Sequence, residues 1–131
     1  MFKVTLSVFL IGHFLGDFYL QTNKLADSKE KSFKDLLVHS FIYLFSIALI
    51  VITILGFSFL KWAILVSLIH FFVDLFKFYL SKNNKIKRKR KKFLYILDQL
   101  IHIITILIVT VRINYMKQLS TQTYFRVFQT F

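Results

Sequence analysis

The sequence predicts an all-α integral membrane protein, an up-down four-helix bundle followed by an interfacial amphipathic helix. Its 131 residues are 56% hydrophobic and include 17 Phe, three Gly and no Pro, a composition typical of one small membrane domain. Four apolar runs follow one another along the chain, and basic residues gather in segments between them. We therefore expect a four-helix transmembrane domain over residues 1–111 and a polar and aromatic tail over residues 112–131.

The first apolar run, residues 2–20, carries His13 and Asp17. A cleavable signal peptide has an uncharged apolar centre and a cleavage site of small residues, and the sequence that follows this run offers no such site. The run is therefore expected to remain as the first transmembrane helix. Gly12 and Gly16 lie one turn apart on it, which should let a neighbouring helix approach closely.

Two further spans follow the polar segment 21–34, which is expected to be a connecting loop. Residues 36–55 contain no Asp, Glu, Lys or Arg and are long enough to cross roughly 30 Å of hydrocarbon at about 1.5 Å per residue. Residues 56–58 are the only break before the next apolar run, residues 59–80. These two helices should form an antiparallel hairpin with a very short turn.

The fourth span is expected at residues 93–111, directly after the most basic segment of the chain. That segment, residues 81–92, holds eight Lys or Arg in twelve positions. Beyond Arg112, aromatic and apolar side chains recur at helical spacing at Tyr124, Val127, Phe128 and Phe131. This period predicts an amphipathic helix that lies along the membrane surface.

The distribution of basic residues predicts the orientation and the partners. Segments 21–34 and 81–92 together hold twelve Lys or Arg, so both should be cytoplasmic, with both termini on the opposite side. They should also attract anionic lipid head groups. Because the net charge of +12 is concentrated in these loops, no nucleic-acid partner is expected. Membrane lipids, and a second copy of the chain, are the expected partners of the apolar surface.

Each expected helix contains one histidine with an aspartate one turn away. The first and third helices read His-x-x-x-Asp, and the second and fourth read Asp-x-x-x-His. Because the order reverses with helix direction, all four histidines should lie at similar depth, with the aspartates nearer the cytoplasmic rim. The motif order also allows two tandem helical hairpins. The pairs are His13 with Asp17, Asp35 with His39, His70 with Asp74, and Asp98 with His102.

Asp35 is the exception among the aspartates. It lies at the boundary between a loop and a helix, where an aspartate commonly caps the helix N-terminus. Capping is therefore its expected role, and it is left out of the candidate metal ligands. Tyr43 continues the same helix face as His39 and is expected to contact the histidine layer.

Imidazole and carboxylate groups one turn apart on facing helices are typical ligands of divalent transition metals in helical bundles. Without Cys, any metal must be bound by nitrogen and oxygen, and Zn²⁺ is expected ahead of Fe or Mn. His39 is also a candidate general base, and four residues are candidates for positioning an anionic or carbonyl-bearing substrate: Gln21, Lys24, Lys77 and Gln99. Alternatives for the same residues are a proton or ion relay and purely structural hydrogen bonds between helices. The predicted ligands are His13, Asp17, His39, His70, Asp74, Asp98 and His102.

An ordered set of motifs resembles a family of small bacterial and phage membrane proteins. The set comprises His13-Phe14-Leu15-Gly16-Asp17-Phe18-Tyr19-Leu20-Gln21, then Lys24, His39, the segment His70-Phe71-Phe72-Val73-Asp74-Leu75-Phe76-Lys77, and Leu97-Asp98-Gln99-Leu100-Ile101-His102. It is similar to the family called domain of unknown function 3307, over roughly residues 4–110. The resemblance implies a multi-pass protein of the bacterial inner membrane and supplies no activity.

Three functional interpretations stay open at this point. The first is a metal-dependent hydrolase that acts on a lipid or lipid-linked substrate, where the metal lowers the pKa of a bound water to about 7. The second is a transporter or channel in which the same residues bind protons or metal ions. The third is a non-catalytic membrane effector whose basic loops and tail bind another protein.

Overall fold

The computed structural model describes the backbone of residues 1–82 and 88–129 and the side chains of residues 1–81 and 92–122. Every regular element in these ranges is helical, which confirms the predicted all-α class. The elements are α1 (Phe2–Phe14), the π-helical turn η1 (Leu15–Tyr19), α2 (Asn23–Ser28), α3 (Phe33–Leu55), the 3₁₀ turn η2 (Phe57–Phe59), α4 (Leu60–Lys82) and α5 (Arg88–Gln129).

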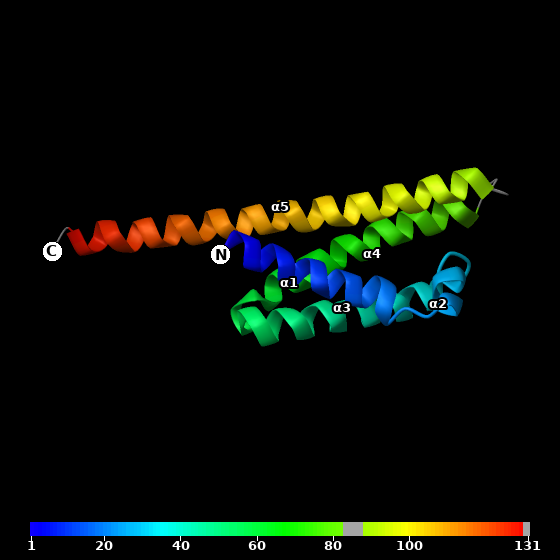
Figure 1. Cartoon of the computed structure of the whole chain (residues 1–131), viewed down its shortest axis with the longest axis horizontal. Coiled ribbons are helices and arrows are strands. Elements are labelled where there is room, and N and C mark those ends of the chain that lie inside the picture. Colours follow the sequence, from blue (N-terminus) through cyan, green and yellow to red (C-terminus); the bar gives the residue numbers. More distant parts are fainter. Residues whose placement is uncertain (83–87, 130–131) are drawn as a thin grey trace.

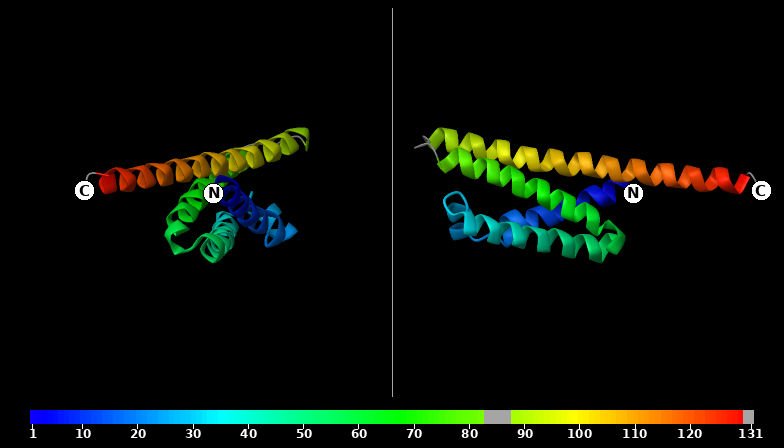
Figure 2. Two further views of the ribbon diagram at one scale, coloured as in Figure 1. Left: turned by 60° about the vertical axis from the view of Figure 1, so that its left-hand side comes forward. Right: turned by 180° about the vertical axis from the view of Figure 1, so that it is seen from behind.

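The four longer helices pack in a closed order. α1 packs against α3 and α5, α3 also packs against α4, and α4 packs against α5 (Figure 1). The short helix α2 lies at the end of the molecule where α4 ends and α5 begins (Figures 1 and 2). The polar segment that contains α2 therefore lies at the same end of the molecule as the end of α4 and the start of α5.

Local sequence explains where the helices begin and end. The Thr22 hydroxyl accepts a hydrogen bond from the Leu25 backbone N–H and caps α2. The Ser32 hydroxyl accepts one from the Asp35 N–H, so the cap of α3 is Ser32 rather than Asp35. α3 ends at Gly56, whose φ of +91° favours glycine. The predicted break at 56–58 is confirmed.

Three helical segments are long and apolar enough to cross a membrane: Phe33–Leu55, Phe57–Ser81 and Lys92–Gln122. The predicted first span is not among them, because its regular α-helix α1 has only 13 residues before the π-helical turn. Large apolar side chains cover the outside of the three segments, and Phe41, Phe45 and Phe76 are each about two-thirds exposed at 70%, 67% and 67%. Such a surface suits contact with lipid.

The tail does not form a helix of its own. α5 runs without interruption from Arg88 to Gln129, through the predicted boundary between residues 111 and 112. The sequence contains no Pro and no Gly beyond Gly56, so nothing in this stretch breaks the helix. The last turns of α5 project beyond the other helices (Figures 1 and 2). The side chains of Tyr124, Val127, Phe128 and Phe131, on which the predicted amphipathic face depends, lie outside the described residues.

Gly12 and Gly16 allow the close packing of α1 and η1 on α3, as predicted. A Cβ atom at Gly12 would lie 3.0 Å from the Ile47 Cα. A Cβ atom at Gly16 would lie 2.9 Å from the Tyr43 ring and 3.2 Å from the Tyr43 Cα. Since the backbone of α3 cannot move aside locally, both positions require glycine.

Gly16→Ala is therefore expected to destabilise the protein by about 1–3 kcal/mol, because the added methyl group overpacks the contact with Tyr43. The sign of this change in stability is informative, because replacing Gly by Ala within a helix normally stabilises the helix. Thermal unfolding in detergent micelles measures the effect, with Ile11→Ala as a control on the exposed side of α1. An unchanged or higher midpoint for Gly16→Ala would contradict the packing.

The interior is divided into an apolar end and a polar end. The apolar end lies near the start of α1 and the end of α3 and is built from Val8, Phe9, Ile47, Val51, Phe59, Ala63, Val66, Ile106, Val109 and Ile113. The polar end lies next to α2 and contains buried histidines, aspartates and lysines. Burial of so many ionisable groups is costly unless they are paired or bind a metal.

Candidate metal centre

The four histidines and three of the paired aspartates meet in one buried cluster, which we call the His/Asp cluster. It consists of His13, Asp17, His39, His70, Asp74, Asp98 and His102, all of them 6% exposed or less. The ring of His70 lies at its centre, with ring centroids 4.1 Å from His102, 5.4 Å from His39 and 6.0 Å from His13. The predicted convergence of one histidine from each long helix is therefore present.

Asp17 reaches the cluster from the π-helical turn η1, directly after α1. π-helical turns are rare and are frequent at functional sites. Neither the spacing His13-x-x-x-Asp17 nor any other sequence signal indicated this turn. His13 and Asp17 are only loosely paired, since His13 Nδ1 and Asp17 Oδ2 are 3.9 Å apart.

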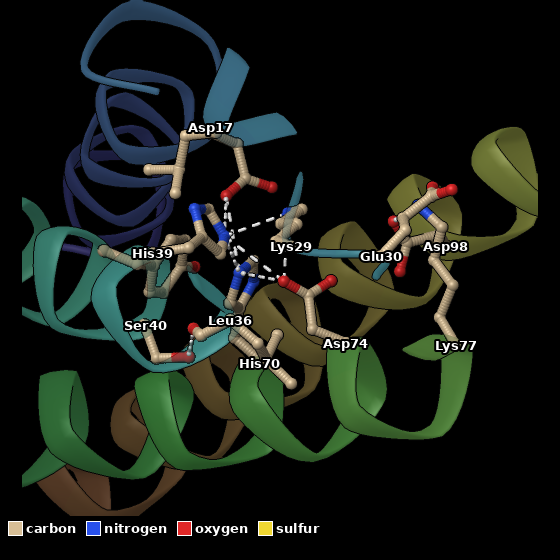
Figure 3. A network of polar contacts seen from close by, with 12 residues as sticks. Asp17, Lys29, Glu30, Leu36, His39, Ser40, His70, Asp74, Lys77 and Asp98 are labelled. Carbon is tan, nitrogen blue, oxygen red and sulfur yellow. Dashed lines mark hydrogen bonds and ion pairs between the residues drawn. The ribbon is translucent and has the colours of Figure 1, made fainter. Parts of the chain in front are cut away.

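His39, His70 and Asp74 form the tightest group (Figure 3). The two Nε2 atoms are 3.1 Å apart. Asp74 Oδ2 lies 3.2 Å from His39 Nε2 and 3.5 Å from His70 Nε2. Neighbouring ligands of a tetrahedral zinc ion with bonds of about 2.0–2.1 Å lie roughly 3.3–3.4 Å apart. The three atoms therefore have the spacing of one face of such a site.

Asp17 adds a fourth ligand atom, an oxygen, beside the same two nitrogens. Its Oδ1 lies 3.4 Å from His39 Nε2 and 3.3 Å from His70 Nε2. It has no hydrogen-bond partner among the described residues, although it is buried. Its distances fit those of a further ligand.

Hydrogen bonds alone do not satisfy this arrangement. An imidazole nitrogen either donates one proton or offers one lone pair. Yet His39 Nε2 lies within 3.4 Å of atoms from four residues: Asp17, Lys29, His70 and Asp74. A proton on His39 Nε2 can be donated to only one of His70 and the two carboxylates. An unprotonated Nε2 can accept from Lys29 or His70 but leaves both carboxylates facing its lone pair. A metal ion accepts electron pairs from several of these atoms at once.

Lys29 is a member of the site that the sequence analysis missed. It lies at the end of α2, is 8% exposed, and its Nζ donates to Asp74 Oδ2 at 3.0 Å and lies 3.0 Å from His39 Nε2 (Figure 3). The expected loop 21–34 contains this capped helix, which folds back over the cluster. Among the four lysines of the segment, Lys24 looked closest to the site in sequence, yet its side chain is exposed.

A second group of atoms lies on the other side of Asp74. Asp98 Oδ1 is 3.3 Å from His102 Nε2, and Asp74 Oδ1 is 3.8 Å from the same nitrogen. Lys77 Nζ donates to Asp98 Oδ2 at 3.1 Å and lies 3.3 Å from Glu30 (Figure 3). Lys77 is thus at the site, bound to a carboxylate.

The remaining predicted residues lie at the edges of the His/Asp cluster. His13 Nδ1 is 3.3 Å from the Tyr43 hydroxyl, and the Tyr43 ring stacks on His70 with centroids 3.6 Å apart. Gln99 Nε2 donates to Asp17 Oδ2 at 3.4 Å. Asp35 stays outside the cluster, in the first turn of α3, in line with its omission from the predicted ligands.

A polar cavity of about 170 Å³ adjoins the cluster. It is large enough for several water molecules. It lies between η1, α2, α4 and α5 and is lined by Asp17, Gln21, Ala26, Asp27, Lys29, Glu30, Lys77, Tyr95, Asp98 and Gln99. The cluster therefore adjoins a space that can hold small polar molecules, next to α2.

Comparison with known proteins gives one match. A family model described as a protein of unknown function, DUF3307, matches residues 5–131. No curated protein and no solved structure matches the chain. The match covers nearly the whole sequence, including every member of the His/Asp cluster, and so confirms the resemblance seen in the motifs. The chain belongs to the DUF3307 family.

Proposed function

We propose that the protein is an integral membrane protein whose His/Asp cluster binds a divalent transition metal. The observation that carries this proposal is the group formed by His39, His70 and Asp74, whose three facing atoms lie 3.1–3.5 Å apart. Asp17 supplies a further oxygen. A ligand set of two imidazoles and one or two carboxylates suits Zn²⁺, with Fe and Mn next.

The metal centre is proposed to lie near the cytoplasmic face of a bacterial inner membrane, within a four-helix bundle that includes α1. The basis is the position of the cluster beside α2, where Lys29 contacts His39 and Asp74, together with the Lys and Arg residues of segments 21–34 and 81–92. Those segments are proposed to contact anionic lipid head groups. The exposed apolar side chains are proposed to face lipid or a second copy of the chain.

Hydrolysis of a lipid or lipid-linked substrate is the reaction that the site supports best. A metal held by His39, His70 and Asp74 would supply Lewis acidity and an activated water. The overall hydrolysis would consume one water molecule, whose oxygen bonds to the ester or phosphoester centre while the leaving alkoxide takes up the released proton. Lys77 and Gln99, which line the cavity, would position the anionic or carbonyl group. His39 is assigned as a ligand rather than a free base, because its Nε2 faces His70 and both carboxylates.

The interior beyond the histidine layer argues against a transport path. A transporter or channel needs a polar route onward from the cluster to the other side. Among the described residues, that region is filled by the apolar end of the core, and its buried polar side chains are only hydroxyls: Thr5, Ser46, Ser67 and Thr110. A path of this kind offers little to a charged solute.

Metal content is the direct test. Protein purified in detergent and exposed to Zn²⁺, then freed of unbound metal, should retain stoichiometric metal, and His70→Ala should lose it. Thr110→Val is a matched control, because Thr110 is fully buried on α5 but belongs to the apolar end. Metal-free wild-type protein, or full metal retention in His70→Ala, would contradict the proposal.

The reaction is tested separately. Metal-loaded protein in mixed micelles is assayed with a phosphatidic acid, a polyisoprenyl diphosphate and a diacyl glycerophospholipid, for release of phosphate or fatty acid. We expect turnover of at least one substrate and its loss in His70→Ala. Absence of turnover of all three by protein with bound metal would argue for the non-catalytic interpretation.

A further inference from the structure

We propose that the His/Asp cluster binds two metal ions rather than one, with Asp74 as a bridging ligand. This inference rests on the proposed metal centre and extends it. The first ion is the one held by His39 and His70. The second would be held by Asp98 and His102, on the opposite side of the Asp74 carboxylate.

The two oxygens of Asp74 face different partners. Oδ2 lies 3.2 Å from His39 Nε2 and 3.5 Å from His70 Nε2. Oδ1 lies 3.8 Å from His102 Nε2. A carboxylate with one oxygen directed at each of two ligand groups has the arrangement of a bridge between two metals, which in two-metal sites lie about 3.5–4 Å apart.

Buried atoms without hydrogen-bond partners support a cation site in the second group. Asp74 Oδ1, Asp98 Oδ1 and His102 Nε2 have no hydrogen-bond partner among the described residues. Their side chains are only 3%, 5% and 2% exposed. Asp98 Oδ1 and His102 Nε2 face each other at 3.3 Å. Because one ligand atom from each of Asp74, Asp98 and His102 lies within 4.8 Å of the others, and buried polar atoms are nearly always satisfied, a cation between them would supply the partner that these atoms lack.

The charges of the cluster also favour cations. Three buried carboxylates, those of Asp17, Asp74 and Asp98, face two lysines. One lysine contacts each proposed site: Lys29 binds Asp74 Oδ2, and Lys77 binds Asp98 Oδ2. At the second site Lys77 therefore leaves Asp98 Oδ1 to a metal, whereas a metal at the first site must compete with Lys29 for Asp74 Oδ2.

Two ions define the substrate class. Two bridged divalent ions with two lysines would give the centre excess positive charge, which is complementary to a phosphate group. Two-metal sites stabilise the attacking and the leaving oxygen of phosphoryl transfer. The water oxygen forms a bond to phosphorus, the bond from phosphorus to the lipid oxygen breaks, and that oxygen takes up a proton. A lipid phosphate ester is therefore the expected substrate.

The number of bound ions tests the inference. Wild-type protein stripped with chelator in detergent is titrated with Zn²⁺, separated from free metal and analysed for elemental content. We expect two equivalents in the wild type and one in His102→Ala, whose loss affects only the second site. Asp27→Asn is the matched control and should keep two equivalents, because Asp27 lines the cavity but does not contact the cluster.

The outcomes separate the two proposals. One equivalent in the wild type would overturn the second site and leave the first intact, whereas none would overturn both. Two equivalents in wild type and in His102→Ala alike would also overturn the assignment. Electron paramagnetic resonance of Mn²⁺-loaded wild-type protein needs no variant: ions that share Asp74 should give an exchange-coupled spectrum, and the spectrum of isolated ions would overturn the bridge.

Discussion

Replacing Asp74 by asparagine is expected to lower metal affinity more than about 100-fold. Asp74 contributes Oδ2 to the group with His39 and His70, and Oδ1 to the group with His102. Removal of a residue that only orients a metal ligand typically lowers metal affinity 10–100-fold. Loss of a charged ligand that both groups share should therefore lower the affinity by more than that. Competition of the purified variant against a chelating indicator dye measures the affinity.

Asp35→Asn is the matched control for this experiment. Asp35 pairs with His39 in the sequence pattern just as Asp74 pairs with His70, but it lies outside the cluster. Its replacement should change metal affinity less than about twofold. Equal affinities of Asp74→Asn and the wild type would show that the carboxylate is not a ligand.

Replacing Lys29 by methionine is expected to have the opposite effect and to tighten metal binding about tenfold or more. The Lys29 ammonium lies 3.0 Å from both Asp74 Oδ2 and His39 Nε2, where it competes with a metal for the same ligand atoms. A tenfold change corresponds to about 1.4 kcal/mol. This change in binding free energy is smaller than the electrostatic interaction energy of two unit charges, which is roughly 4 kcal/mol at a separation of about 4 Å and an effective dielectric constant of about 20. Methionine keeps most of the buried apolar volume of the side chain.

Lys24→Met is the control, because Lys24 lies in the same segment with an exposed side chain. It should leave the affinity unchanged. Weaker metal binding by Lys29→Met would indicate instead that Lys29 holds the cluster together as a structural counterion. That result would contradict competition between Lys29 and the metal for the same ligand atoms.

Much of the fold follows from sequence patterns. Long apolar runs separated by charged segments predicted α3, α4 and the first part of α5, and Gly56 predicted the turn between α3 and α4. The end of α5 was not predicted, because the fall in hydrophobicity after residue 111 was interpreted as the end of the helix. Helical propensity in a stretch without Gly or Pro does not end where hydrophobicity falls.

The candidate site was partly predictable for a different reason. Ionisable residues in apolar helices must face one another, so the sequence alone could group His70 and Asp74 with the other His and Asp pairs. Asp35 did not join them, since it lies in the first turn of α3, where it is only partly buried. Lys29 was not predictable, because its burial depends on how α2 folds back over the cluster and its sequence neighbours are ordinary loop residues.

X-ray absorption spectroscopy of the metal-loaded wild-type protein tests the central claim most directly. If the His/Asp cluster binds the metal, the spectrum should show nitrogen and oxygen neighbours at about 2.0–2.1 Å together with the multiple-scattering pattern of at least two imidazole rings, from His39 and His70. A metal surrounded by oxygen alone, with no imidazole contribution, would contradict the account.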